Sequence, residues 1–412
     1  MNINSLGTFN YENKRVLLRL DINSPIDSDT KKIVNENRID KCIPTLKYLV
    51  ESNAKIAIIA HQGDTLDYQN LISMEEHACK LTEKLGLEVE YIDDVCGPAA
   101  IEKIRKLKNG QVILLGNLRY LTEEVSTFED SVKLEAKEML HTYIIRNLAP
   151  LFDYYVNEAF SAAHRNAPSM VAFQEFMPSA AGDLFFKEID ALNKVMDHPI
   201  RPCVFILGGA KISDAFGMMK QVLENGNADQ ILTCGVTGQV MLLAAGYDIG
   251  KSNIQFLKDR SLDVFVKPAQ EYLGNYPGRI LYPSDLAYDS EGFRKEISVE
   301  NLPLELGTLD IGRETIKKYC EVINKAGMLF MNGPAGVYED PRFEDGTKAI
   351  AHAMAMAKGY SVIGGGDTVT AVAKYVELDK VDYVCTAGGA MVRYLSGNKL
   401  PLMEAMERNS GK

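Results

Sequence analysis

The chain has 412 residues, of which 46% are hydrophobic and 25% charged, and its formal net charge is −11. This length predicts two domains, and the composition is that of a globular protein. The acidic balance argues against a general nucleic-acid-binding protein. We therefore expect no nucleic-acid partner. No apolar run approaches the roughly 18 residues of a membrane span, so we expect no membrane partner either. Seven dispersed cysteines and an N-terminus without a leader-like apolar stretch favour a cytoplasmic protein.

Short apolar runs alternate with amphipathic segments along the chain. The runs predicted as buried strands in the first half are 15–22, 54–61, 110–117 and 154–160. Those in the second half are 202–209, 228–235, 327–334, 360–367 and 383–390. Apolar residues recur at helical spacing between the early runs, as in MEEHACKLTEKLG. Strands that are apolar on both faces and alternate with helices predict an α/β fold with parallel sheets covered on both sides.

Basic and polar residues follow the strands predicted in the first half. They are Asp21, Asn23, Arg38, His61, Arg119, His164 and Arg165. Each alone would more often be a surface residue, but together they occupy successive strand ends, where open α/β sheets bind ligands. Arginine binds phosphate and carboxylate through a two-pronged fork, and histidine adds donors. The first half therefore predicts a pocket for a small polyanion, such as a phosphorylated carboxylic acid.

Glycine-rich turns follow the strands predicted in the second half. They are LGGAKISD (207–214), MNGPAGVYED (331–340), IGGGDT (363–368) and TAGGA (386–390). Any one could be a tight connection, but four together favour a phosphate site, since glycine lets phosphate approach the backbone. Lys211 adds a positive charge, and Glu339 could hold ribose hydroxyls. Asp367 beside an anion site at a helix start suggests a nucleotide phosphate carrying Mg²⁺.

Two common nucleotide motifs are missing from the sequence. Neither GxxxxGK[ST] nor a GxGxxG that opens a helix after the first strand is present. Their absence argues against a P-loop ATPase and against a simple dinucleotide-dependent dehydrogenase. One half of the chain thus suits a phospho-acid and the other a nucleotide.

These motifs resemble the phosphoglycerate kinase family over nearly the whole chain. The segments that carry the resemblance, in family order, are VLLRLDINSPID, NRIDKCIPTLKYLVESNAKIAIIAHQG, VNEAFSAAHRNAPSM, FILGGAKISD, MNGPAGVYED, VIGGGDTVTAV and TAGGAMVRYLSGNKLPLMEAM. HQG, GGAKISDAF and DIGRET are similar to the archaeal branch. The resemblance implies two Rossmann-like domains joined by an interdomain helix and hinge. We expect a phosphoglycerate-binding domain at 1–172 with a C-terminal return at about 395–412. A nucleotide-binding domain would span 173–394, including a linker helix at about 180–196.

The resemblance also implies a reaction, the reversible transfer of a phosphoryl group between 1,3-bisphosphoglycerate and ADP, giving 3-phosphoglycerate and ATP, with Mg²⁺, as in glycolysis and gluconeogenesis. It assigns the acid to Asp21, Asn23, Arg38, His61, Arg119 and Arg165. It assigns the nucleotide to Gly208, Gly209, Lys211, Asn332, Pro334, Glu339, Gly364, Gly365, Gly366, Asp367 and Thr368, with Asp367 on the metal. The groups expected to act on the transferring phosphoryl are Arg38, Lys211, Gly365 and Gly366. A monomer is expected, with a dimer as the alternative, and the hinge would close around both ligands.

Several positions depart from the family pattern. Asp64 stands where many members carry a basic residue, Gly116 where the family usually has Glu, and Asp183 where an aromatic is usual. A reversed charge near the acid keeps open a paralogous kinase for a different phosphorylated carboxylic acid, or a non-catalytic phospho-acid-binding protein. The acidic run at 123–138 is expected to be a solvated helix face.

Overall fold

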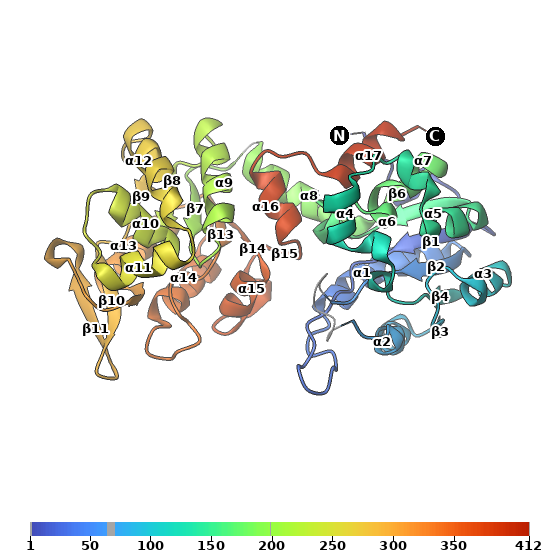
Figure 1. The fold of residues 1–412 in the computed structure, drawn as a ribbon, viewed down its shortest axis with the longest axis horizontal. Coiled ribbons are helices and arrows are strands. Elements are labelled where there is room, and N and C mark those ends of the chain that lie inside the picture. The colour runs from blue at the N-terminus through green and yellow to red at the C-terminus, as the bar shows by residue number, and fades with distance from the viewer. Residues whose placement is uncertain (1, 64–70, 198, 412) are drawn as a thin grey trace. The chain divides into compact units, whose positions relative to one another are not determined.

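The computed structural model describes residues 2–63, 71–197 and 199–411. Asp64 lies outside these ranges. The chain forms two compact units, the first made of Met1–Ile189 and Lys399–Lys412 and the second of Asp190–Asn398. Each unit contains a parallel six-stranded sheet flanked by helices (Figure 1). The expected α/β fold with two parallel sheets is therefore confirmed.

The first unit is built on a sheet with strand order β3-β4-β2-β1-β5-β6. Its strands are β1 (Arg15–Arg19), β2 (Lys55–Ile59), β3 (Val89–Tyr91), β4 (Val112–Leu114), β5 (Tyr154–Asn157) and β6 (Ser179–Ala181). Its helices are α1 (Asn37–Glu51), α2 (Glu75–Leu85), α3 (Pro98–Arg105), α4 (Ser126–Val132), α5 (Tyr143–Leu148), α6 (Pro168–Val171), α7 (Phe173–Phe176) and α17 (Pro401–Arg408). Four of the five residues of β1 and of β2 are buried, as strands covered on both faces require.

The second unit repeats this plan with strand order β15-β14-β13-β7-β8-β9. Its parallel strands are β7 (Cys203–Leu207), β8 (Gln230–Thr233), β9 (Ile280–Leu281), β13 (Met328–Asn332), β14 (Tyr360–Gly364) and β15 (Tyr383–Cys385). Its helices are α9 (Ile212–Glu224), α10 (Gly235–Ala244), α11 (Lys251–Asp259), α12 (Val266–Asn275), α13 (Arg313–Ile323), α14 (Asp345–Met356), α15 (Gly366–Ala373) and α16 (Gly389–Leu395). The predicted strands all form, but each ends earlier than predicted, and most of each polar or glycine-rich motif lies in the following loop.

The second unit also carries a small antiparallel sheet that the sequence did not predict. Its order is β11-β10-β12, with β10 (Asp285–Ser290), β11 (Phe293–Ser298) and β12 (Thr308–Ile311). β11 has the sequence FRKEIS, and no residue of it is buried. The parallel strands were predicted from continuous apolar runs. An exposed, charged edge strand contains no such run, so β11 could not be predicted in this way.

The boundary between the units differs from the expected 172/173. β6 pairs with β5 in parallel, so the segment up to residue 181 completes the first sheet. The linker helix α8 (Asp183–Met196) begins after β6 rather than at about 180. The division between the units falls within α8, at 189/190, and the return to the first unit falls at 398/399 rather than about 395.

A buried carboxyl holds the start of α8. Glu158 follows β5 and is fully buried. Its carboxyl oxygens accept hydrogen bonds from the backbone N–H groups of Leu184 (3.1 Å) and Phe185 (3.4 Å), and from the hydroxyl of Thr45. Burial raises the pKa of Glu158 to about 8, although these three donors favour the charged form.

The C-terminal helix α17 completes the first unit. It packs against α6 and α7, and the backbone N–H of Leu402 donates to the carbonyl of Ala163 at 3.2 Å. Leu402 and Met406 are buried, and the guanidinium of Arg408 pairs with the carboxylate of Glu175 at 3.2 Å. Both ends of the chain therefore belong to the same unit (Figure 1).

Candidate active site

One pocket lies in the second unit, at the carboxyl ends of its parallel strands. Its volume is about 390 Å³. The loops after β7, β8, β13 and β14 line it, together with β12 and the start of α16. The predicted nucleotide residues that line it are Gly208, Gly209, Lys211, Asn332, Pro334, Glu339, Gly365, Gly366, Asp367 and Thr368. This is the edge at which open α/β sheets bind ligands, as expected.

Glycines bring three of these loops into direct backbone contact. The N–H of Gly209 donates to the carbonyl of Pro334 at 2.8 Å, and the N–H of Gly235 donates to that of Ala335 at 3.0 Å. A Cβ on Gly333 would lie 2.2 Å from the carbonyl oxygen of Gly208, and Gly333 has φ +89°. Only glycine fits there, so the pocket floor is made largely of main chain.

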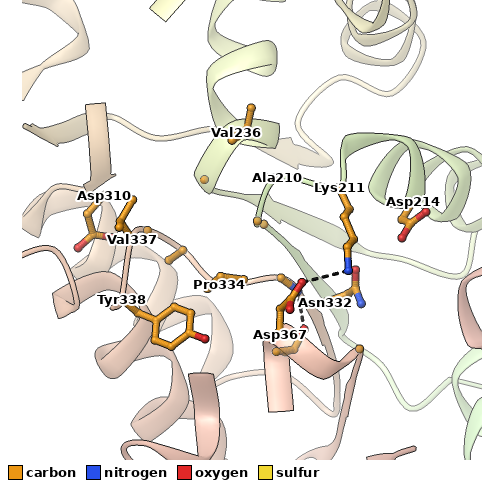
Figure 2. Close-up of a pocket in the computed structure, with 18 of the residues that line it drawn as sticks. Ala210, Lys211, Asp214, Val236, Asp310, Asn332, Pro334, Val337, Tyr338 and Asp367 are labelled. Carbon is orange, nitrogen blue, oxygen red and sulfur yellow. Dashed lines mark hydrogen bonds and ion pairs between the residues drawn. The ribbon is translucent and has the colours of Figure 1, made fainter. Parts of the chain in front are cut away.

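One cation and one carboxylate face each other across the pocket. The ammonium group of Lys211, just before α9, lies 3.1 Å from a carboxylate oxygen of Asp367 in the first turn of α15. Figure 2 shows the two side chains pointing toward one another, with Asp310 and Val337 in a separate part of the lining. Both charged side chains are more than two-thirds exposed, so an entering ligand can reach both.

The N-terminus of α15 presents backbone donors to the same region. The first N–H groups of a helix have no partner within the helix and carry the positive end of its dipole. Gly365 precedes this helix with φ +90°, and a Cβ there would lie 2.8 Å from the amide nitrogen of Asn332. Thr368 accepts the N–H of Gly333 at 2.7 Å and so ties α15 to the loop after β13.

Gly364 has a different role from its neighbours. It is the last residue of β14, is buried, and is not among the residues that line the pocket. A Cβ at this position would lie 2.0 Å from the sulfur of Met391. Met391, on α16, thus packs directly against Gly364, and the nucleotide contact expected of Gly364 stays a prediction.

Much of the remaining lining is apolar, and the sequence analysis did not predict this surface. Its larger apolar residues are Val236, Phe256, Leu286, Leu309, Ile311, Val337 and Val392. The guanidinium of Arg260 stacks on the ring of Phe256 at 4.0 Å from the centroid. The apolar lining residues come from six separate segments, and no single motif in the sequence indicated that they form one surface. An apolar slot of this kind accepts a flat heterocycle.

In the first unit, Arg38 and Asp21 form an ion pair. One guanidinium nitrogen of Arg38, on α1, lies 2.8 Å from both carboxylate oxygens of Asp21, which follows β1. The hydroxyl of Ser161 donates to the same carboxylate. Asn23 lies further along this loop, where its side-chain oxygen accepts the N–H of Gly63 at 3.0 Å. Asp21 therefore orients Arg38, and Asn23 fixes the loop after β2.

His61, Arg119 and Arg165 lie together, as predicted, around a small cavity of about 10 Å³. Arg19, which the sequence analysis missed, joins them: its guanidinium lies 2.8 Å from Nδ1 of His61. The signal available in the sequence was Arg19 within the apolar run predicted at 15–22. Burial, and then the charge of Arg19, keep the pKa of His61 well below its usual range. His61 is consequently neutral at physiological pH.

Two acidic residues lie among these arginines, so the expected solvated helix face at 123–138 is wrong at these positions. Glu124 is buried and accepts hydrogen bonds from the N–H (2.7 Å) and hydroxyl (2.6 Å) of Ser169. Burial raises the pKa of Glu124. Glu129 pairs with Arg165, whose Nε lies 2.7 Å from its carboxylate. The run is broken into short helical segments, and from these the carboxyl groups of Glu124 and Glu129 lie beside the arginine cluster.

Comparison with known proteins decides the family. A model of the phosphoglycerate kinase family matches residues 6–398. The chain belongs to the phosphoglycerate kinase family. It is 40% identical to the phosphoglycerate kinase of Methanothermus fervidus, over 98% of this chain and 96% of the relative. It is also 40% identical to that of Methanococcus maripaludis, over 99% of both chains.

Solved structures of the phosphoglycerate kinase family have the same fold. The crystal structure of the enzyme from Pyrococcus horikoshii superposes with a TM-score of 0.89 at 38% identity, covering 99% of both chains. That of Coxiella burnetii gives 0.82 at 28% identity, covering 99% of this chain and all of the other. The expected family, its archaeal character and the kinase class are confirmed.

The pocket suits a metal ion that arrives with a nucleotide. Among the described residues there is no group of three or more His, Cys, Asp or Glu side chains that could hold an ion by itself. Asp367 is a single exposed carboxylate beside a helix N-terminus. Mg²⁺ is commonly bound by one or two carboxylates together with substrate phosphates, and Asp367 fits that arrangement. No helix in the described ranges is long and apolar enough to cross a membrane.

Proposed function

We propose that this kinase catalyses the reversible transfer of a phosphoryl group between 1,3-bisphosphoglycerate and ADP, with Mg²⁺ bound to the nucleotide. The observation that carries the proposal is that the two units present chemically different sites. The second has a backbone-lined pocket with Lys211 and Asp367 at a helix N-terminus, and the first has an arginine cluster at the same edge of its own sheet. Family membership supports the assignment of the two substrates.

The nucleotide would occupy the second-unit pocket. Its phosphates would lie over the glycine-rich floor, with Lys211 and the N–H groups of Gly365 and Gly366 near the transferring phosphoryl. Asp367 would hold Mg²⁺, which supplies positive charge to the phosphates when bound. Glu339 and Pro334 would flank the ribose, and the apolar slot would take the base. On binding, Lys211 would exchange its pairing with Asp367 for a pairing with a phosphate.

The phosphorylated acid would bind at the arginine cluster. The cavity between these side chains has room for about one water molecule, so the acid would lie against the partly exposed faces of Arg38, Arg119 and Arg165. Asp21 orients Arg38, and neutral His61 offers a hydrogen bond without adding charge. Asn23 would contact the acid from the loop after β1. In the direction from ATP, the group that accepts the phosphoryl would be the carboxylate of 3-phosphoglycerate, which this acid carries in addition to its phosphate.

The chemistry needs no general base. In the direction of ATP synthesis, an ionised oxygen of the ADP β-phosphate attacks the acyl phosphate, a new P–O bond forms, and the bond from phosphorus to the acyl oxygen breaks. The electron pair leaves with the carboxylate of 3-phosphoglycerate. The protein contributes positioning and positive charge around the transferring group, here Lys211, Arg38 and the helix N-terminus. We further propose that the chain acts as a cytoplasmic monomer.

A coupled assay tests the proposal. Purified protein receives ATP, Mg²⁺ and 3-phosphoglycerate, and 1,3-bisphosphoglycerate is read through NADH consumption by glyceraldehyde-3-phosphate dehydrogenase. We expect turnover of about 1–100 s⁻¹ or more. The matched control Lys211→Ala should remove it without removing the fold. Absence of turnover in a protein that still binds ADP would reject 3-phosphoglycerate as the substrate, and other phosphorylated carboxylic acids would then be tested.

A further inference from the structure

Two buried hydrogen-bond acceptors in the second-unit pocket have no partner among the described residues: one carboxylate oxygen of Asp310 and the side-chain oxygen of Gln239, on α10. The other oxygen of Asp310 already accepts from Arg294 and from the N–H of Gly346, both at 2.9 Å, whereas the only acceptor atom of the Gln239 side chain is the unpartnered one. Gln239 is 8% exposed, and it lies one helical turn after Val236, which lines the apolar slot. A buried acceptor without a donor costs stability, so such an atom in a ligand pocket indicates where a ligand donor is missing.

A chain of hydrogen bonds fixes which end of the Gln239 amide faces the pocket. The amide nitrogen of Asn253 donates to the carbonyls of Ile249 (2.7 Å) and Leu306 (3.1 Å). The oxygen of Asn253 must therefore be the atom that accepts the N–H (2.9 Å) and the hydroxyl (3.2 Å) of Thr308. Because Thr308 spends its single hydroxyl proton on Asn253, its Oγ1 can only accept from Gln239.

The amide nitrogen of Gln239 indeed lies 2.9 Å from Oγ1 and 3.4 Å from the carbonyl oxygen of Thr308. Both amide protons are thus directed to Thr308, and rotating the amide would place two acceptors against each other. The oxygen of Gln239 is held as an acceptor by this network before any ligand arrives. An acceptor fixed in advance loses no conformational freedom on binding.

We infer that Gln239 accepts a hydrogen bond from the exocyclic 6-amino group of the purine base, and so selects adenine nucleotides. This inference rests on the proposed function, since it requires a nucleotide in the pocket. The apolar slot supplies stacking and shape for any purine. Gln239 adds a requirement for a hydrogen-bond donor at one point on the edge of the base. Asn253 and Thr308 are positioning residues, because their hydrogen bonds fix the orientation of the Gln239 amide.

The test compares ADP with purine riboside 5′-diphosphate, which carries hydrogen in place of the 6-amino group. Binding of each to the full-length protein is measured by titration calorimetry with Mg²⁺. We expect ADP to bind about 5- to 150-fold more tightly, the range for leaving one buried acceptor unsatisfied. In Gln239→Leu the ratio should fall to near one. In Thr308→Val, which frees the amide to rotate, it should also fall.

Lys211→Ala serves as the matched control, because it should weaken both ligands equally and leave the ratio unchanged. A wild-type ratio within twofold, or a ratio that survives both Gln239→Leu and Thr308→Val in folded proteins, would overturn the role of Gln239. Those results leave the nucleotide pocket itself intact. If neither ligand binds the wild-type protein, the nucleotide assignment fails, and the role of Gln239 fails with it.

Discussion

The pair formed by Lys211 and Asp367 should matter for catalysis and hardly at all for stability. We consider Lys211→Ala and Asp367→Asn, each alone and both together. The two charges lie 3.1 Å apart, with exposed side-chain fractions of 74% and 68%. At that distance two unit charges in water attract by about 1.3 kcal/mol. Side-chain entropy and salt screening reduce exposed pairs to about 0.2–1 kcal/mol, so each variant should lower the melting temperature by less than about 4 °C.

The effect on turnover should be far larger, because both groups would act on phosphate charge that develops during transfer. Removing one such group typically costs about 10²- to 10³-fold in kcat, or about 2.7–4 kcal/mol. The coupled assay gives kcat and KM, and differential scanning calorimetry gives the melting temperature of the same preparations. In the double variant the losses should not add, since each residue serves the same phosphoryl group. A variant that keeps kcat within threefold, or that loses more than about 2 kcal/mol of stability, would contradict this assignment.

Three further results are expected. Gly333→Ala should lower the free energy of unfolding by about 1–3 kcal/mol and weaken ADP binding, because alanine would have to adopt a positive φ with its Cβ 2.2 Å from the carbonyl oxygen of Gly208. Thermal unfolding should show this loss. The control Gly274→Ala should lose no stability, since a Cβ at residue 274 meets nothing within 4 Å. Glu158, with a pKa raised from 4.5 to about 8, binds more protons folded than unfolded, so its contribution to stability should decline as pH rises from about 4.5 to 8. Denaturant unfolding should find this slope reduced in Glu158→Gln, and identical slopes would refute it. Small-angle scattering should show a smaller radius of gyration with both substrates than with either alone if transfer involves closure of the hinge, and unchanged profiles would count against closure.

The fold was predictable from sequence to the extent that its strands are continuous apolar runs. β1, β7 and β13 stand out in this way, and their alternation with amphipathic segments was enough to predict parallel sheets. β6 and β9 are three and two residues long, and β11 is exposed and charged, so they left no such signal. Missing β6 displaced the expected domain boundary.

The site was predictable where a short motif supplies several groups together. The glycine-rich turns located Lys211, Gly365 and Asp367, since chain neighbours remain neighbours in space. Gln239 and Phe256 were not predictable, because each is brought to the pocket by a different helix. Glu124 was misread for a related reason: a carboxylate in a charged run becomes buried only when an arginine from elsewhere packs against the same loop.

Because α17 is at the end of the chain, the first unit cannot finish folding until the whole chain has been translated. Its N-terminal part is translated by residue 189, yet the helix that covers α6 and α7 lies beyond residue 399. At about 5–20 residues per second, a ribosome needs about 10–40 s to make the intervening chain. During that time the apolar surface that Leu402 and Met406 later cover is exposed. The residues of the second unit, by contrast, are all translated before α17, so the second unit can fold while the first still lacks its last helix.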